Sequence, residues 1–111
     1  TATSTTAESQ MLSKPMYVHS IPNNNDNQDI VSMGTNSAVI ARKVIDNGYQ
    51  VMAIHAIAIA QAIDFLSCDQ FAKLSSKTKQ FYDSIRTIIP TIVEDKVHYE
   101  KIQEVIDYLR K

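Results

Sequence analysis

Residues 51–66 constrain the fold of this chain more than any other feature, because they are apolar on nearly every side of a helix. A helix that is apolar all round has to be buried. Its alanines would let neighbouring backbones approach closely; they are Ala53, Ala56, Ala58, Ala60 and Ala62. A chain of 111 residues with two other short predicted helices can hardly surround such an element. The segment therefore predicts neighbours from sequence outside this chain or from other subunits.

Helical periodicity extends over most of the chain, which contains only two glycines and three prolines. Apolar residues recur at helical spacing over several long stretches, and this pattern predicts an all-α fold. The longest helix is expected to begin near Thr35 or Asn36, either of which can cap it, and to end at about Leu66. Gly48 lies in its middle, where glycine costs roughly 1 kcal/mol relative to alanine.

Two amphipathic helices are predicted in the last part of the chain. One follows Ser67 to Asp69 and stops before Pro90, and the other runs from about Asp95 to Leu109. The whole chain is expected to form one domain fragment with three parts. These are a Ser/Thr-rich segment with a polar loop (1–35), a long buried helix (36–66) and two amphipathic C-terminal helices (67–111).

Charge and cysteine content exclude several classes of partner and site. The net charge is -1, with 11 basic and 12 acidic residues scattered along the chain, so neither nucleic acid nor an anionic membrane is an expected partner. The single cysteine, Cys68, excludes an internal disulfide framework and a multi-cysteine zinc site; it is expected to pack in a reduced, cytoplasmic environment. The three histidines are too widely spaced to predict a metal site.

A loop rich in asparagine is the strongest candidate for a binding function. It has the sequence KPMYVHSIPNNNDNQDIVS, is bounded by Pro15 and Pro22, and is dense in residues that favour turns. Each amide side chain offers two donors and an acceptor oxygen, so a cluster of amides can orient a polar substrate without adding net charge. From composition alone, a solvated turn is favoured over a binding loop, because Asn and Asp are ordinary turn residues.

The stretch SIPNNNDNQDIVSMGTNSA, followed by the helix that ends in AIAQAIDFL, resembles the C-terminal signature of the aromatic amino-acid ammonia-lyases and aminomutases. The resemblance covers roughly residues 3–66, with NQDIVSMGT from Asn27 to Thr35 as its core, whereas residues 67–111 match only as helices in the expected place. It implies that the chain is a helical fragment of a larger, mainly helical, bundle-like enzyme, with an N-terminal active-site loop. Such enzymes are homotetramers with long buried helices at the centre, so the implied partners are the remainder of the lyase and other subunits.

Members of this family carry an electrophile, 4-methylidene-imidazol-5-one, formed from an internal Ala-Ser-Gly triad, and use it to eliminate ammonia from an aromatic amino acid. That triad is absent here, because Met33 precedes Gly34 and Asn47 precedes Gly48. The resemblance therefore implies that the electrophile forms outside this chain, that no metal is needed, and that the chain alone is inactive. No residue of the chain is assigned as catalytic.

The family motif implies that Asn27 and Gln28 sit beside the prosthetic group and the amino and carboxylate ends of the substrate, with Asn24 close by. Histidine-specific members usually carry glutamate at the position of Gln28, and tyrosine-type bacterial members resemble this sequence at Asn24. A carboxylate could engage an imidazole or an ammonium group by its charge, whereas a neutral carboxamide can only donate and accept hydrogen bonds. Tyrosine, which would give coumarate, or phenylalanine is therefore favoured over histidine.

Other polar residues near the motif are expected to support the site. Glu8 lies in TTAESQ, which resembles the family segment ahead of the loop, and structural support is favoured over catalysis for it. His19 and Ser32, within the loop, are the other supporting candidates. His55 departs from the family pattern, which more often shows an acidic residue, and is predicted to be a neutral histidine satisfied inside a helical bundle.

Three other functions remain open from the sequence. A histidine ammonia-lyase would differ in substrate, and a tyrosine aminomutase shares the prosthetic group but adds ammonia back at the β-carbon. A non-catalytic helical interaction module is the alternative from another class. The intact loop, through Asn27, Gln28 and Ser32, favours an active parent enzyme over a relic.

Overall fold

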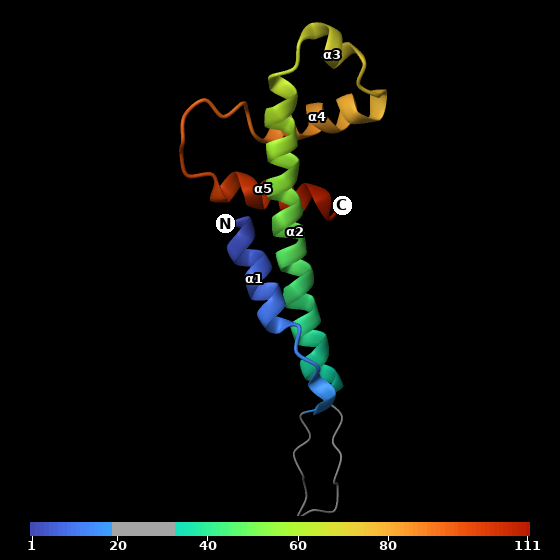
Figure 1. The fold of residues 1–111 in the computed structure, drawn as a ribbon, viewed down its shortest axis with the longest axis vertical. Helices are drawn as coiled ribbons and strands as arrows, with labels where there is room; N and C mark the ends of the chain where they lie inside the picture. The colour runs from blue at the N-terminus through green and yellow to red at the C-terminus, as the bar shows by residue number, and fades with distance from the viewer. Residues whose placement is uncertain (19–32) are drawn as a thin grey trace, which may run out of the picture. The chain divides into compact units, whose positions relative to one another are not determined.

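The structure is a computed structural model that describes residues 1–18 and 33–111. Every regular element in those residues is helical, so the predicted all-α class is confirmed. No helix among them is long and apolar enough to cross a membrane. In chain order the elements are α1 (Ala2–Leu12), the short 3-10 helix η1 (Met16–Val18), α2 (Gly34–Asp64), α3 (Cys68–Ala72), α4 (Ser76–Ile88) and α5 (Tyr99–Leu109) (Figure 1).

The described residues fall into two compact units, Thr1–Gly48 and Tyr49–Lys111. Helix α2 contributes its first half to the first unit and its second half to the second. In the first unit, α1 runs antiparallel beside the first half of α2 (Figure 1).

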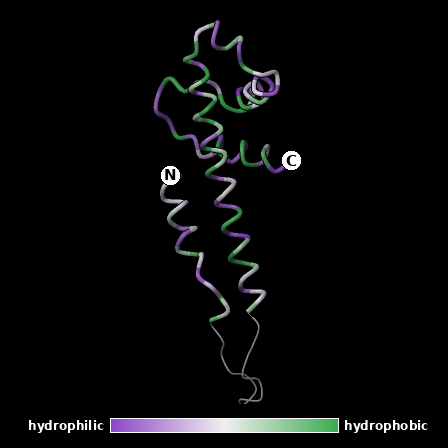
Figure 2. The backbone as a smooth tube through the Cα atoms, turned by 45° about the vertical axis from the view of Figure 1, so that its right-hand side comes forward, coloured by the Kyte–Doolittle hydropathy of each residue, from purple (hydrophilic) through white to green (hydrophobic). Residues whose placement is uncertain are grey.

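Helix α1 is not predicted from the sequence, because threonine and serine have only modest helix propensity. Its tube in Figure 2 is mostly pale or purple, so it lacks a strong apolar stripe. The hydroxyls of Thr5, Thr6 and Ser9 donate to the carbonyls four residues earlier, at 3.2, 2.9 and 3.1 Å. These bonds satisfy the side chains within the helix itself, which lets a Ser/Thr-rich segment remain helical.

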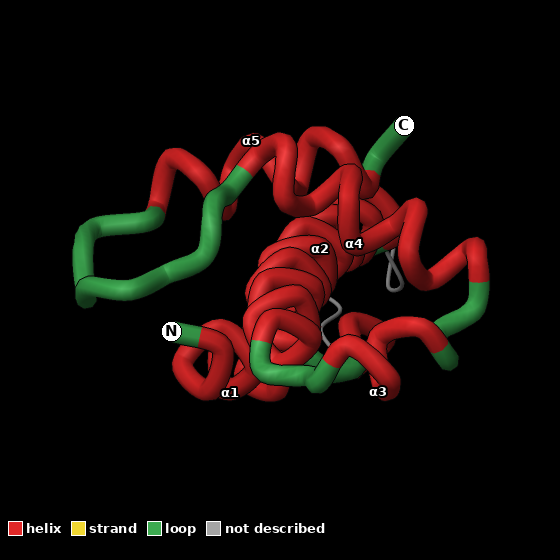
Figure 3. The backbone as a smooth tube through the Cα atoms, turned by 90° about the horizontal axis from the view of Figure 1, so that it is seen from above, coloured by secondary structure: helices red, strands yellow, loops and turns green. Residues whose placement is uncertain are grey.

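The second unit contains the apolar core. Ala53, Ala56 and Ala60 of α2 pack with Ile85 of α4 and Val105 of α5. Viewed from above in Figure 3, α4 and α5 lie on the same side of α2, which explains why one face of this helix is buried. The small alanine side chains of α2 allow the larger isoleucine and valine side chains of the other two helices to reach its surface.

Two helix boundaries differ from the sequence prediction. The second predicted helix is two helices, α3 and α4, because the chain carries two serine caps. The Ser67 hydroxyl accepts from the Gln70 amide in a capping box, and the Ser75 hydroxyl accepts from the Thr78 amide at 3.1 Å. Helix α5 begins at Tyr99, later than predicted, whereas α4 ends at Ile88, just before Pro90 as expected.

Two side chains predicted to be buried are exposed in this chain. His55 lies on an exposed side of α2, and Cys68 is exposed at the start of α3. The core residues Ala53, Ala56 and Ile57 define the buried face of this part of α2, and His55 projects away from it. Residues two positions apart in a helix point in very different directions, so His55 faces away from the core although Ala53 lies in it. The apolar composition of the whole segment does not show this difference.

Candidate functional site

Most of the predicted site lies outside the described residues. This applies to Asn24, Asn27 and Gln28, and to the supporting candidates His19 and Ser32. Glu8 is the one predicted site residue that the structure describes, and it lies in α1. The geometry of the site therefore starts from Glu8.

Glu8 is held by two residues of α2. The side-chain amide of Asn47 donates to Glu8 Oε2 at 2.8 Å and to the Ser9 hydroxyl at 3.2 Å. The Lys43 ammonium lies 3.7 Å from the other carboxylate oxygen, Oε1. Lys43 and Asn47 are four residues apart, so they share one face of α2 and approach α1 together. The helices thus bring a carboxylate, a carboxamide and a cation to one place.

The packing of α1 on α2 is polar where it is most buried. Asn47 is 4% exposed and Thr5 is 8% exposed, and these are the buried polar residues of the described chain. All the buried apolar side chains among the described residues belong to the second unit. Because burying a carboxamide is costly unless it is hydrogen-bonded, the bonds of Asn47 to Glu8 and Ser9 decide how well the two helices fit.

A second polar cluster ties the end of α2 to α4. Asp64 Oδ1 accepts from the Tyr82 hydroxyl at 2.6 Å, and Oδ2 accepts from Arg86 at 2.6 Å and from Thr91 at 2.8 Å. The Arg86 and Asp64 side chains are only 12% and 13% exposed. Three donors therefore satisfy one carboxylate that has little access to water.

These contacts lower the pKa of Asp64 and raise the pKa of Tyr82. Burial raises the pKa of the Asp64 carboxyl, but hydrogen bonds from Tyr82 and Thr91 and the charge of Arg86 together hold that pKa below its ordinary value. The bond that Tyr82 donates to Asp64, together with burial, raises the pKa of the Tyr82 phenol. The cluster is thus most favourable with Asp64 ionised and Tyr82 protonated.

Gln61 extends this cluster to the segment after α4. Its side chain donates to the Ile92 carbonyl at 3.1 Å and accepts from the Ile92 amide at 3.0 Å. Arg86 also donates to the Ile89 carbonyl at 3.1 Å. These bonds fasten residues 89–92 to α2 and α4, and this is a structural role. The sequence analysis did not predict this role, although two polar residues, Gln61 and Asp64, in an otherwise apolar segment could have indicated it.

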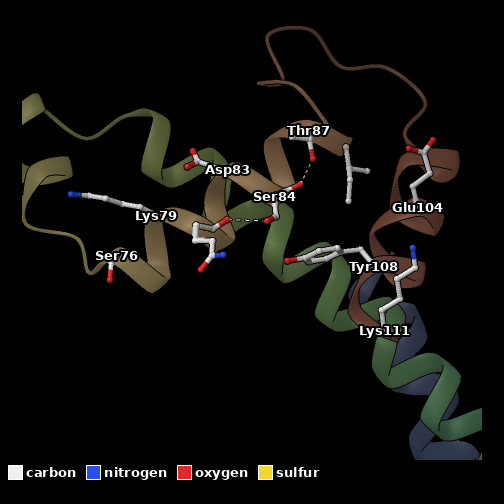
Figure 4. Close-up of a pocket in the computed structure, with 10 residues that line it drawn as sticks. Ser76, Lys79, Asp83, Ser84, Thr87, Glu104, Tyr108 and Lys111 are labelled. Atoms are coloured by element: carbon white, nitrogen blue, oxygen red, sulfur yellow. Dashed lines mark hydrogen bonds between the residues drawn. The ribbon is translucent and has the colours of Figure 1, made fainter.

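A groove of about 770 Å³ lies between α4 and α5 (Figure 4). The hydroxyls of Ser84 and Thr87 on its wall donate to helix carbonyls, at 2.9 and 2.7 Å. Its charged residues have both signs: Lys79, Asp83, Glu104 and Lys111. Because these two hydroxyls are already engaged and the charges of the groove are mixed, the groove gives no basis for assigning a ligand. Among residues 1–18 and 33–111, no cluster of His, Cys, Asp or Glu side chains could hold a metal ion.

Comparison with known proteins decides the family. The family model described as aromatic amino acid lyase matches residues 1–87, which include α1, the asparagine-rich loop, all of α2, and α3. The chain belongs to this family. The predicted resemblance is therefore confirmed, and both Glu8 and Asn47 lie within the matched residues.

Individual family members agree with this assignment along the chain. A tyrosine 2,3-aminomutase from Streptomyces globisporus, whose name describes it as dependent on the methylidene-imidazolone group, is 37% identical over 99% of this chain and 20% of its own length. A histidine ammonia-lyase from Bacillus subtilis is also 37% identical, over 99% of this chain and 21% of its own length. The likeness thus extends past residue 66, further than the sequence motif predicts.

The crystal structure of tyrosine aminomutase from Streptomyces globisporus gives a TM-score of 0.87 at 37% identity, over 96% of this chain and 20% of that one. The chain therefore spans about a fifth of the length of these relatives.

Proposed function

We propose that this chain is the C-terminal segment of an enzyme that eliminates ammonia from an aromatic L-amino acid. The match of residues 1–87 to the aromatic amino acid lyase family carries this proposal. The chain supplies the loop with Asn24, Asn27 and Gln28, and these amides bind the amino and carboxylate ends of the substrate. Glu8, His19 and Ser32 support that loop.

The electrophile of this reaction has to come from elsewhere in the enzyme. The prosthetic group 4-methylidene-imidazol-5-one would supply an electrophilic carbon, and it forms from an Ala-Ser-Gly triad that this chain lacks. The residues of the chain therefore cannot form the group, and the chain alone is inactive. No metal takes its place in the proposal.

Tyrosine is the favoured substrate, with coumarate as the product. The support is Gln28, since a carboxamide lacks the negative charge with which a carboxylate would attract an imidazolium. The relatives divide between the name histidine ammonia-lyase and the name tyrosine aminomutase. An aminomutase is the second candidate, and the 37% identity to one supports it.

The active enzyme is a cytoplasmic homotetramer in this proposal. The support within the chain is the second half of α2, whose apolar residues Met52 and Ile59 are 55% and 45% exposed although another side of this helix is buried. A second copy, or the rest of the polypeptide, would cover this face.

The test is an assay of the full-length enzyme with tyrosine, phenylalanine and histidine under matched conditions. Coumarate from tyrosine is expected, and β-tyrosine in place of coumarate would show the aminomutase. Urocanate from histidine would overturn the substrate preference while leaving the elimination reaction standing. If the enzyme converts none of the three amino acids, the non-catalytic helical module is favoured.

The variant Gln28→Glu is the matched probe of selectivity. Because it adds a carboxylate without changing the size of the side chain, we expect kcat/KM for tyrosine to fall and that for histidine to rise. Unchanged ratios would show that position 28 does not select the substrate. Gln103→Glu makes the same change on the exposed surface of α5 and serves as the control.

A further inference from the structure

We propose that helix α1 detaches from α2 while the second unit stays folded, and that the buried Asn47 amide controls this opening. The inference goes beyond the proposed function and does not depend on it. In the sequence, α1 precedes the asparagine-rich loop and α2 follows it. The contact between the two helices therefore decides whether the segments on either side of that loop stay side by side.

The two units differ in what stabilises them. The second unit buries large apolar side chains, of which Ile85 and Val105 are 0% exposed. In the first unit, the buried residues that the structure describes are Thr5 and Asn47, and both are polar. Burial of apolar surface is the dominant favourable contribution to folding, whereas a hydrogen bond within the protein replaces one to water and its net gain is modest. The first unit should therefore open at a lower free energy than the second.

Detachment of α1 exposes little apolar surface that is now buried. Met11 is already 73% exposed, and Ala7 is exposed as well. The hydroxyls of Thr6 and Ser9 donate to carbonyls of α1 itself, at 2.9 and 3.1 Å, so these bonds do not require α2. Much of what α1 would lose by leaving α2 is thus polar contact, for which water can substitute.

A detached α1 would not remain helical. The helix has 11 residues and is rich in threonine and serine, whose helix propensity is only modest. Isolated helices shorter than about 12–15 residues are marginal in water even when they are rich in alanine. Its backbone amides would therefore exchange with solvent each time α1 leaves α2, which makes the opening measurable.

Asn47 contributes more to this contact than Lys43 does. The Asn47 amide donates to Glu8 Oε2 at 2.8 Å and to the Ser9 hydroxyl at 3.2 Å, and the residue is 4% exposed. A hydrogen bond to a charged group is stronger than one between neutral groups. Lys43 lies 3.7 Å from Glu8, and both side chains are about half exposed, so that ion pair holds the helices weakly. Replacing Asn47 should therefore loosen α1 first.

The experiment is hydrogen exchange, followed by mass spectrometry, on the 111-residue chain. We expect the amides of residues 6–12 to exchange at least about tenfold faster than the protected amides of α4 and α5. Asn47→Leu should speed exchange in residues 6–12 further, on the order of tenfold, and should change that of α4 and α5 by less than about twofold. Gln103→Leu, which removes an exposed amide-to-carboxylate bond of 3.1 Å to Asp107, is the matched control and should leave exchange in α1 unchanged.

A second variant, Glu8→Gln, keeps the inference testable if Asn47→Leu does not fold. It preserves the size of the side chain and an acceptor oxygen but removes the negative charge, so the bond from Asn47 is weakened and not lost. Exchange in residues 6–12 should rise by roughly threefold, less than in Asn47→Leu, because a charge-assisted bond becomes a neutral one. The protected amides of α4 and α5 should again keep their rates.

Four outcomes would overturn the inference. Equal protection of α1, α4 and α5 in the unsubstituted chain would show that they open as one cooperative unit. Faster exchange of all helices together in either variant would show the same, and unchanged exchange of α1 in both variants would show that Asn47 does not control the opening. Rapid exchange in every helix of the unsubstituted chain would mean that the second unit does not stay folded. None of these outcomes bears on the reaction, so the proposed function stands or fails separately.

Discussion

Asn47 and Asp64 show two different ways in which this chain buries a polar side chain. Asn47 gives its donors to a carboxylate that remains half exposed, whereas Asp64 receives three donors and has little access to water. In the first arrangement the other carboxylate oxygen, Glu8 Oε1, lies 3.7 Å from the exposed Lys43 ammonium. In the second arrangement three side chains donate to one carboxylate, which is typical of a group that stabilises the fold.

Replacing Asp64 with asparagine should destabilise the chain strongly. The variant keeps the size of the side chain but leaves the charge of Arg86, which is 12% exposed, without its partner. Breaking a buried ion pair in this way costs about 3 kcal/mol in the free energy of unfolding. Denaturant unfolding of Asp64→Asn beside the unsubstituted chain measures the loss.

The control for that variant is Glu104→Gln. Glu104 pairs with Lys101 at 2.8 Å, but the two side chains are 50% and 43% exposed. Loss of an exposed pair should change the free energy of unfolding by less than about 1 kcal/mol. Equal effects of the two substitutions would show that the Asp64 cluster is not buried in solution.

The Asp64 cluster should also make stability depend on pH in a defined direction. The folded-state pKa of Asp64 is lower than its unfolded value, so the folded chain favours the ionised carboxylate. This contribution is complete above the unfolded pKa of about 4 and is lost as the pH falls through the lower folded-state pKa. Between roughly pH 6 and pH 2, the unsubstituted chain should therefore lose more of its free energy of unfolding than Asp64→Asn does. Parallel profiles for the two chains would contradict the assignment.

At the scale of helices, the sequence predicted α2, α5 and the end of α4, because each carries an apolar stripe or a proline boundary. It missed α1, since that helix satisfies its hydroxyl groups internally and has no apolar stripe. It also missed the break between α3 and α4, where the extended backbone of Ser75 places its hydroxyl to accept from the Thr78 amide and so to begin a new helix. Periodicity reports which face is apolar, but it does not report where a helix is interrupted.

The same reason limits what the sequence could predict about the site. The motif predicts the asparagine-rich loop and Glu8 as parts of the site, since they lie within one local pattern. The partner of Glu8 lies 39 residues away in another helix, and no local pattern contains both. Only the packing of α1 on α2 brings Asn47 to the carboxylate.

Gly48 offers a test of helix propensity within α2. A Cβ atom built on this residue meets no atom within 4 Å, so alanine has room in the described structure. Gly48→Ala should then raise the free energy of unfolding by about 0.5–1 kcal/mol, because alanine loses less backbone entropy in a helix. Thermal unfolding of the two chains measures the gain. A loss of stability would mean that something outside the described residues approaches this position closely.

At the scale of the whole molecule, the chain buries only part of its apolar surface. Helix α2 packs Ala53, Ala56 and Ala60 into the core, yet Met52 and Ile59 on another side remain 55% and 45% exposed. Phe65, just past the helix, is 81% exposed. The chain spans about a fifth of the length of its relatives, so this surface is the part of the fold that sequence outside the chain would cover.

The isolated chain should therefore associate in solution through this side of α2. Met52 and Ile59 are seven residues apart and share one face of the helix, so the double variant Met52→Gln with Ile59→Gln removes much of its apolar character. Sedimentation of the unsubstituted chain should show oligomers, and the double variant should shift toward the monomer with unchanged helix content by circular dichroism. Val93→Gln is the control, because Val93 is 90% exposed but lies outside α2, and it should leave association unchanged. A monomeric unsubstituted chain would show that exposed apolar residues of α2 do not drive assembly, and the support that they give to an oligomeric enzyme would be lost.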